Sequence, residues 1–216
     1  MMTGFRPVHG VYLSSTLDLE GLYGNAIQAA GDEVVLHRPE QVSDPERISF
    51  AVCWLPTAES VKAYPNLKLA MSIGAGVNDL LDNPGIGPEV AIARVRDPHQ
   101  AALMAGYAAH EVLHVSRGFS ELARSADAAR WAPLPMHPPE DTIVAVLGNG
   151  TMGAAVTDAL RALGFSLRVA CRTAPTEPIE GVRYFSGSDG VIAAASGAHL
   201  VINVLPLTPA TENVLN

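Results

Sequence analysis

Three glycines with a spacing suited to dinucleotide binding follow an apolar run at residues 143–147. They are Gly148, Gly150 and Gly153. Where a strand turns sharply into a helix, the first glycine of such a set permits the turn. The second lets the backbone approach a pyrophosphate, and the third lets the helix pack against the strand. A glycine-rich turn without a ligand would show the same spacing, so the flanking sequence decides between the two interpretations.

The sequence around the glycines has the pattern of a strand, a helix and a second strand. Residues 151–163 are rich in Ala and Leu and end at Gly164, a residue type that often terminates a helix. Residues 166–171 form a second apolar run, which completes the start of a βαβ unit. The start of the helix attracts phosphate. We therefore predict a dinucleotide site formed by Gly148, Asn149, Gly150, Thr151, Met152 and Gly153.

The residues after the second apolar run indicate which dinucleotide is bound. A site that selects NAD usually carries Asp or Glu here for the ribose 2′-hydroxyl, whereas this chain has Arg172 and Thr173. An arginine beside a hydroxyl suits a 2′-phosphate through charge-assisted hydrogen bonds. The sequence thus favours NADPH and leaves NADH open. The alternative is that Arg172 is an ordinary exposed loop arginine.

A second turn suited to binding an anion lies earlier in the chain. Gly74, Ala75, Gly76 and Val77 follow an apolar run and precede a helix-like segment. Successive backbone amides in such a turn form a nest that holds a carboxylate, although a plain tight turn is the simpler interpretation. Trp54 ends the preceding apolar run and is expected either to wall a small-substrate pocket or to belong to the core.

Residues 110–114 read His-Glu-Val-Leu-His, which formally matches the HExxH pattern of zinc proteases. That pattern places two imidazoles on one helical face with a general base between them. The usual position of a third ligand holds Ser120. We therefore expect no metal site and interpret His110 and His114 as surface or interface residues. Five further histidines show no metal-ligand spacing: His9, His37, His99, His137 and His199.

Strand-like and helix-like segments alternate along the chain. Apolar runs are expected to form strands at 10–13, 33–37, 48–55, 67–73, 91–95, 143–147, 166–171, 182–185 and 199–205. Helices are expected near 17–30, 58–64, 98–114, 151–163 and 190–196, with Asp97 and Gln100 forming a capping box. This alternation indicates parallel sheets covered on both faces, which bind ligands at the carboxyl ends of their strands.

Composition excludes several classes of protein. A net charge of −8 without a long basic run argues against nucleic acid or an anionic membrane as the main partner. No run reaches transmembrane length, and residues 1–10 lack the apolar core of a signal peptide. Cys53 and Cys171 lie in apolar runs and are expected to be buried thiols. We therefore expect a cytoplasmic protein with small molecules or other subunits as partners.

With these segments placed, the chain resembles the D-isomer-specific 2-hydroxyacid dehydrogenases, and among them the glyoxylate/hydroxypyruvate reductase branch. The resemblance rests on Trp54, on 67–68 with 72–77, on 97–98, on Met104 with Tyr107, on Trp131 with 133–135, and on 148–153, 171–173 and 205–211. It implies an α/β fold of two doubly wound, Rossmann-like domains. These are a substrate domain at 1–97 without its C-terminal return helix and an incomplete NAD(P)-binding domain at 98–216.

The resemblance also implies roles for individual residues. The expected activity is NADPH-dependent reduction of a small 2-oxo acid to the 2-hydroxy acid, in a homodimer of the full-length protein. Trp54 and the 74–77 backbone would border and hold the substrate carboxylate. Further cofactor contacts are expected from Met104, Leu205, Pro206 and Thr211. Ala105 and Gly106 depart from the family pattern beside Met104.

The family's catalytic Arg, Glu and His fall after the segment that corresponds to Asn216, so no catalytic residue is expected within these 216 residues. Residues 212–216 resemble the start of a helix. One hypothesis is therefore that the chain is the N-terminal part of a reductase and is inactive alone. The alternative is an inactive nucleotide-binding or interaction module, with a zinc hydrolase using His110 and His114 as a third.

Overall fold

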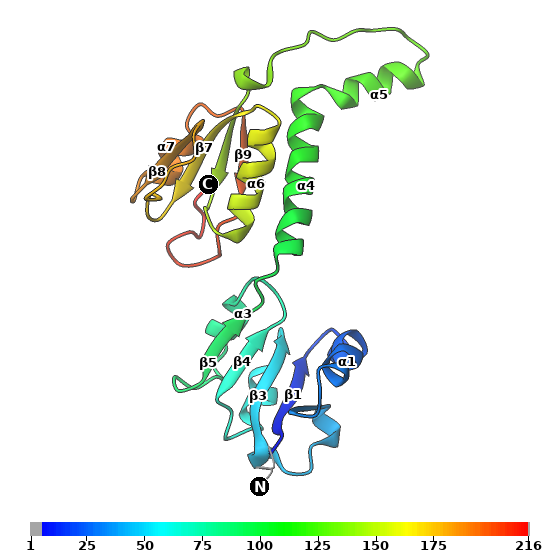
Figure 1. The fold of residues 1–216 in the computed structure, drawn as a ribbon, viewed down its shortest axis with the longest axis vertical. Helices are drawn as coiled ribbons and strands as arrows, with labels where there is room; N and C mark the ends of the chain where they lie inside the picture. The colour runs from blue at the N-terminus through cyan, green and yellow to red at the C-terminus, as the bar shows by residue number, and fades with distance from the viewer. Residues whose placement is uncertain (1–5, 216) are drawn as a thin grey trace. The chain divides into compact units, whose positions relative to one another are not determined.

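The computed structural model describes residues 6–215 and contains two compact units, Met1–Arg96 and Asp97–Asn216. Each unit is built around its own parallel β-sheet with its own helices (Figure 1). No helix of the described residues is long and apolar enough to cross a membrane.

The first unit contains a five-stranded sheet in the order β2-β1-β3-β4-β5. All neighbouring strands in it are parallel. The strands are β1 (Val8–Ser14), β2 (Val34–His37), β3 (Ile48–Trp54), β4 (Leu69–Ser72) and β5 (Ala91–Arg94). Because parallel strands end at one edge, the segments that follow Ser14, His37, Trp54 and Ser72 lie along the same side of the sheet.

Three helices connect these strands: α1 (Leu19–Ala29), α2 (Ala58–Lys62) and α3 (Asn78–Leu81). The Asp18 carboxylate accepts a hydrogen bond from the Gly21 amide and caps α1, and the Thr57 hydroxyl accepts one from Ser60 and caps α2. Alternate residues of a strand point to opposite faces. Val11 and Cys53 therefore contribute to one buried cluster, while Tyr12 and Val52 contribute to a second.

Cys53 makes the stability of the protein depend on alkaline pH. Burial raises the pKa of its thiol from 9.0 to about 12, and the charge of Asp79 acts in the same direction. Above pH 9 the unfolded chain loses this proton while the folded chain keeps it, so stability falls as pH rises. Between about pH 8 and pH 10.5 the loss attributable to Cys53 should reach about 2 kcal/mol. Urea unfolding of the unmodified protein and of Cys53→Ala across this pH range measures the loss. If the free energy of unfolding fell equally steeply with pH in both proteins, Cys53 would not be its cause.

The second unit contains a four-stranded parallel sheet in the order β8-β7-β6-β9. Its strands are β6 (Ile143–Leu147), β7 (Ser166–Cys171), β8 (Val182–Ser186) and β9 (Leu200–Asn203). Its helices are α4 (Pro98–Ser116), α5 (Phe119–Asp127), α6 (Thr151–Ala162) and α7 (Gly190–Ala195). The central strand β6 is flanked by β7 and β9, so the carboxyl ends of all three lie beside the turn that follows Leu147.

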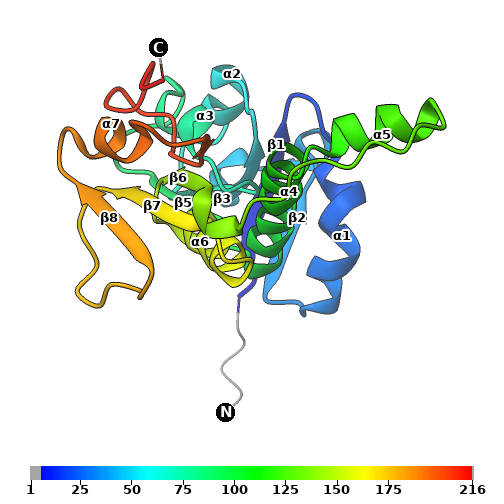
Figure 2. The same cartoon turned by 90° about the horizontal axis from the view of Figure 1, so that it is seen from above.

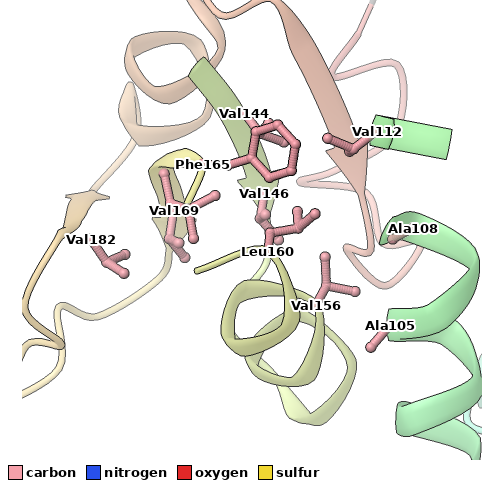
Figure 3. Packing of buried hydrophobic residues seen from close by; sticks show 11 residues of the cluster. Ala105, Ala108, Val112, Val144, Val146, Val156, Leu160, Phe165, Val169 and Val182 are labelled. Carbon is pink, nitrogen blue, oxygen red and sulfur yellow. The ribbon is translucent and has the colours of Figure 1, made fainter. Parts of the chain in front are cut away.

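Helices cover both faces of this second sheet. On one face, Ala105, Ala108 and Val112 of α4 pack with Val156 and Leu160 of α6 in one core cluster (Figure 3). Small alanines on α4 let the two helices approach closely, and they lie side by side in Figures 1 and 2. On the other face, the sheet packs against Ala194 of α7. The sheet is therefore buried on both sides, as expected for a doubly wound fold.

The alternating strands and helices expected from the sequence are confirmed, with differences of at most two residues at the element ends. Three local expectations are wrong. Asp97 caps α4 by accepting a hydrogen bond from the His99 amide, but the described contacts contain no return bond from Gln100. Residues 212–215 form turns instead of a helix, and Asn216 lies outside the described residues. Cys171, expected to be buried, is partly exposed.

Candidate functional site

The three glycines of the dinucleotide motif lie in a tight turn between β6 and α6. Gly148 has a φ of 111°, which other residues rarely adopt. Its amide donates a hydrogen bond to the Ala170 carbonyl at 2.9 Å, so the turn is held against the end of β7. A side chain at Gly148 would also lie 3.2 Å from the Val204 carbonyl oxygen, next to the end of β9. The backbone conformation requires glycine here, and the tight space beside Val204 favours it as well.

Gly153 and Gly150 differ in what surrounds them. A Cβ atom on Gly153 would lie 1.8 Å from the Gly148 carbonyl oxygen, so only glycine lets α6 pack this closely on the turn. A Cβ atom on Gly150 would meet no atom of the protein within 4 Å. Packing therefore does not explain glycine at position 150, whereas a ligand lying against the backbone would.

The start of α6 offers backbone donors to an anion. The amides of Asn149, Gly150 and Met152 form no hydrogen bond with residues of the described chain. The first amides of a helix have no acceptor within the helix, and the helix dipole adds positive potential. A pyrophosphate carries the charge and the acceptor oxygens that these groups require.

Arg172 and Thr173 directly follow β7, whose residue Ala170 is bonded to the glycine turn. Both side chains are exposed, and Arg172 forms no ion pair within residues 6–215. The Arg172 guanidinium is therefore available to a phosphate or carboxylate that approaches this edge of the sheet.

The loop after β9 lies on the other side of the glycine turn. The Val204 amide donates to the Leu147 carbonyl at 3.0 Å, and Leu205 is partly buried against the core. The Thr211 hydroxyl accepts from the Thr208 amide at 2.9 Å and donates to the Pro206 carbonyl. Thr211 therefore holds the loop in shape, which leaves backbone groups and the Pro206 ring to contact a ligand.

Met104 lies near the start of α4 (Pro98–Ser116) and is 40% exposed. Figures 1 and 2 show α4 and α6 running side by side, and both helices begin at the end of the unit where the glycine turn lies. Met104 is thus at the appropriate end of its helix for a cofactor contact.

In the first unit, the expected carboxylate nest follows β4. The Gly74 amide already donates to the Ser72 hydroxyl at 3.1 Å. The amides of Ala75, Gly76 and Val77 form no hydrogen bond with the described residues. The Trp54 ring lies against Gly74, where a Cβ atom would be 3.0 Å from Cζ3 of the ring. Three amides beside an aromatic wall are therefore available to an anion.

Sequence reasoning missed a contact that shapes the loop after Trp54. Leu55 has a φ of 48°, which is unusual for a leucine, and its amide donates to the Asp79 carboxylate at 3.1 Å. Asp79 lies in the first turn of α3, directly after the nest. The bond ties the loop after β3 to the segment after β4. Because the partners are 24 residues apart, local sequence gives no signal of it.

The two histidines of the HExxH segment contact neighbouring side chains. His110 Nδ1 is 3.0 Å from the Glu111 carboxylate, and His114 Nε2 is 2.7 Å from the Ser120 hydroxyl. Within residues 6–215 there is no cluster of three His, Cys, Asp or Glu side chains that would hold a metal ion. Ser120, at the position that a third ligand would need, binds His114 instead, so a zinc hydrolase has no structural support.

Two other histidines form a pair that their spacing did not predict. His9 and His37 stack with ring centroids 5.3 Å apart, and their Nδ1 and Nε2 atoms are 3.0 Å apart. Burial lowers the pKa of His9, and the neighbouring Arg47 and His37 act in the same direction. The pair arises because β1 and β2 are adjacent parallel strands, which is a long-range feature of the fold.

Comparison with known proteins identifies the family. Residues 109–216 match the family model described as the D-isomer specific 2-hydroxyacid dehydrogenase, NAD binding domain. The chain is 33% identical over 184 residues to glyoxylate/hydroxypyruvate reductase A of Serratia proteamaculans, covering 83% of this chain and 58% of the relative. The corresponding protein of Enterobacter sp. is 33% identical over 178 residues, covering 80% of this chain and 56% of the relative. The chain thus spans less than two thirds of the length of these relatives.

Solved structures share the fold across both units. A D-isomer specific 2-hydroxyacid dehydrogenase from Xanthobacter autotrophicus in complex with NADPH and MES has a TM-score of 0.85 and 30% identity, covering 96% of this chain and 66% of its own. An NADPH-dependent glyoxylate/hydroxypyruvate reductase from Sinorhizobium meliloti in complex with NADP and sulfate has a TM-score of 0.80 and 26% identity. That match covers 94% of this chain and 64% of the other. The chain therefore belongs to the D-isomer specific 2-hydroxyacid dehydrogenase family and carries its NAD-binding domain.

Proposed function

We propose that the protein reduces a small 2-oxo acid of the glyoxylate or hydroxypyruvate type with NADPH, and that this chain supplies the binding residues for both. The observation that carries the proposal is the open space at Gly150 beside the crowded Gly153. Together with the unbonded amides at the start of α6, it leaves room for a pyrophosphate where a side chain would otherwise fit.

Bound NADPH would supply the hydride, while residues of this chain position the two molecules. Arg172 and Thr173 would hold the 2′-phosphate, and Met104 with the loop from Leu205 to Thr211 would border the nicotinamide end. Their exposure and their location at one end of the second unit support this assignment. Like the Xanthobacter and Sinorhizobium structures, whose complexes contain NADPH or NADP, this site is suited to the phosphorylated cofactor.

The substrate carboxylate would be held by the amides of Ala75, Gly76 and Val77, with Trp54 excluding water on one side. A carboxylate is a strong acceptor for backbone amides, and the three amides have no partner in the described chain. The relatives from Serratia proteamaculans and Enterobacter sp. are glyoxylate/hydroxypyruvate reductases, which supports a substrate with this carboxylate. The residues named here bind and orient, and proton transfer to the ketone oxygen is assigned to none of them.

Gly76→Ala tests the substrate site. The added methyl meets no protein atom within 4 Å, so the fold should tolerate it, but it intrudes where the carboxylate would bind. When Gly76→Ala is introduced into the protein as its native source produces it, we expect the KM for glyoxylate or hydroxypyruvate to rise about tenfold, with kcat much less affected. NADPH oxidation provides the measurement. An unchanged KM would show that the amides of the nest do not bind the substrate. If the unmodified protein bound NADPH but did not oxidise it, the alternative of a nucleotide-binding module would be favoured.

We also propose that the protein forms a homodimer through the outward face of α4, α5 and the connector that follows. Leu103, Tyr107, Phe119, Leu122, Trp131 and Met136 are exposed apolar residues in this region. Trp131 is 92% exposed and Leu103 is 77% exposed, which is costly for side chains of this size in water. Leu103 and Tyr107 are one helical turn apart and share a face of α4, opposite the alanines that contact α6.

The double substitution Leu103→Glu and Tyr107→Glu should convert the dimer to a monomer because it places two charges in the buried interface. Light scattering should give about twice 22.7 kDa for the unmodified chain and 22.7 kDa for the variant. Ile192→Glu on α7, also an exposed apolar position, is the matched control and should leave the mass unchanged. A monomeric unmodified chain, or a double variant that stays dimeric, would contradict the proposed surface.

A further inference from the structure

The first unit has a cavity of about 360 Å³ at the carboxyl ends of β1 and β2. Its walls come from the end of β1, the first turn of α1 and the segment after β2. The residues that line it include Tyr12, Leu17, Asp18, Glu20, Arg38 and Glu40. This volume suits a small molecule. None of the residues proposed to hold the substrate or the cofactor lines it.

The charged groups of the cavity have a negative balance. The Arg38 guanidinium is paired with Glu20 through Nε and with Asp18 through Nη2 at 3.1 Å. Glu40 lines the same cavity and forms no ion pair within residues 6–215. The cavity therefore contains three carboxylates, of Asp18, Glu20 and Glu40, but only one guanidinium, which is already paired. This excess of negative charge would attract a further cation.

Tyr12 provides a second, independent indication of a ligand. Its side chain is only 6% exposed, yet its hydroxyl forms no hydrogen bond with any described residue. Tyr12 and Glu20 line the same cavity, and burial together with the charge of Glu20 raises the pKa of Tyr12. Because Tyr12 lines the cavity, its hydroxyl oxygen can accept a hydrogen bond from a ligand bound there.

We propose that this cavity binds a small aliphatic cation, with an ammonium or guanidinium group at one end. The cationic group contacts the Glu40 and Asp18 carboxylates and donates a hydrogen bond to the Tyr12 hydroxyl oxygen. Its aliphatic part lies against Leu17, Leu19 and Pro39, which line the same cavity. A cation held this way gains both charge pairing and apolar contact, whereas a neutral or anionic analogue gains no charge pairing.

An NMR titration of the 216-residue chain tests the proposal with three probes of similar shape: butylammonium, butanol and butyrate. We expect saturable amide shifts from butylammonium at Ser14, Leu17 and Glu40, and none that saturate from the other two. Tyr12→Phe keeps the ring and removes the hydroxyl, and it should weaken butylammonium binding about tenfold. Glu40→Gln should weaken it by a similar factor.

Asp32→Asn is the matched control, because Asp32 is an exposed carboxylate of the same unit outside the cavity. It should leave the affinity unchanged. The absence of saturation, an equal loss in Asp32→Asn, or preferential binding of butyrate would overturn the proposal. Because no cavity residue belongs to the proposed cofactor or substrate site, each of these results is independent of whether the protein is a reductase.

Discussion

Gly153→Ala is expected to disrupt the second unit, whereas Gly150→Ala is expected to leave the fold intact and still impair NADPH binding. At position 153 the new Cβ atom would lie 1.8 Å from the Gly148 carbonyl oxygen, which no side-chain adjustment can relieve. The helix must move away from the turn. We expect a loss of at least about 3 kcal/mol in the free energy of unfolding.

At position 150 the new methyl has no neighbour within 4 Å, and the backbone φ of −79° suits alanine. The melting temperature should therefore stay within about 2 °C of the unmodified protein. The methyl nevertheless occupies the space where a pyrophosphate would approach the backbone. NADPH affinity should fall at least about tenfold, which corresponds to ~1.4 kcal/mol.

Thermal unfolding and calorimetric titration of the two variants separate packing from binding. The pair is informative because the two substitutions are chemically identical and three residues apart. If Gly150→Ala bound NADPH as tightly as the unmodified protein, the open space at this position would not be the pyrophosphate site. If Gly153→Ala were as stable as the unmodified protein, α6 would not pack as closely on the turn as the 1.8 Å approach to the Gly148 carbonyl oxygen implies.

Arg172→Ala is expected to weaken NADPH binding about 30-fold while changing NADH affinity by no more than about threefold. The difference arises because only NADPH carries the 2′-phosphate, and a charge-assisted contact of this kind contributes about 2 kcal/mol. Arg172→Lys should give an intermediate value, since lysine keeps the charge but lacks the planar pair of donors.

Arg161→Ala provides the control for the loss of a positive charge. Arg161 is an exposed arginine in the last turn of α6, at the opposite end of that helix from the glycine turn. Its removal should leave both affinities close to those of the unmodified protein. Equal losses of NADPH and NADH in Arg172→Ala would remove Arg172 from the 2′-phosphate contact.

The sequence predicted the parts of the fold that depend on local patterns. The strand, turn and helix around Gly148, Gly150 and Gly153 could be recognised because the required conformations and close contacts involve residues a few positions apart. The alternation of apolar runs with helix-like segments likewise indicated the parallel sheets. In both cases the periodicity of the side chains carries the information.

Features that depend on distant residues could not be predicted in this way. The bond between Leu55 and Asp79, the stacking of His9 on His37, and the cavity at Tyr12 all require the order of strands in the sheet. The HExxH segment shows the opposite case, because its local pattern matches a metal motif while its surroundings supply no third ligand in the described chain. A motif is therefore informative only when the elements around it are the ones its chemistry requires.

Calorimetric titration of the 216-residue chain with NADPH and with NADH tests most directly whether the glycine turn and Arg172 together hold a phosphorylated dinucleotide. We predict saturable binding with one NADPH per chain, and an affinity for NADPH at least about tenfold higher than for NADH, in line with one charge-assisted contact to the 2′-phosphate. Binding of neither cofactor, or tighter binding of NADH, would contradict the assignment of this site.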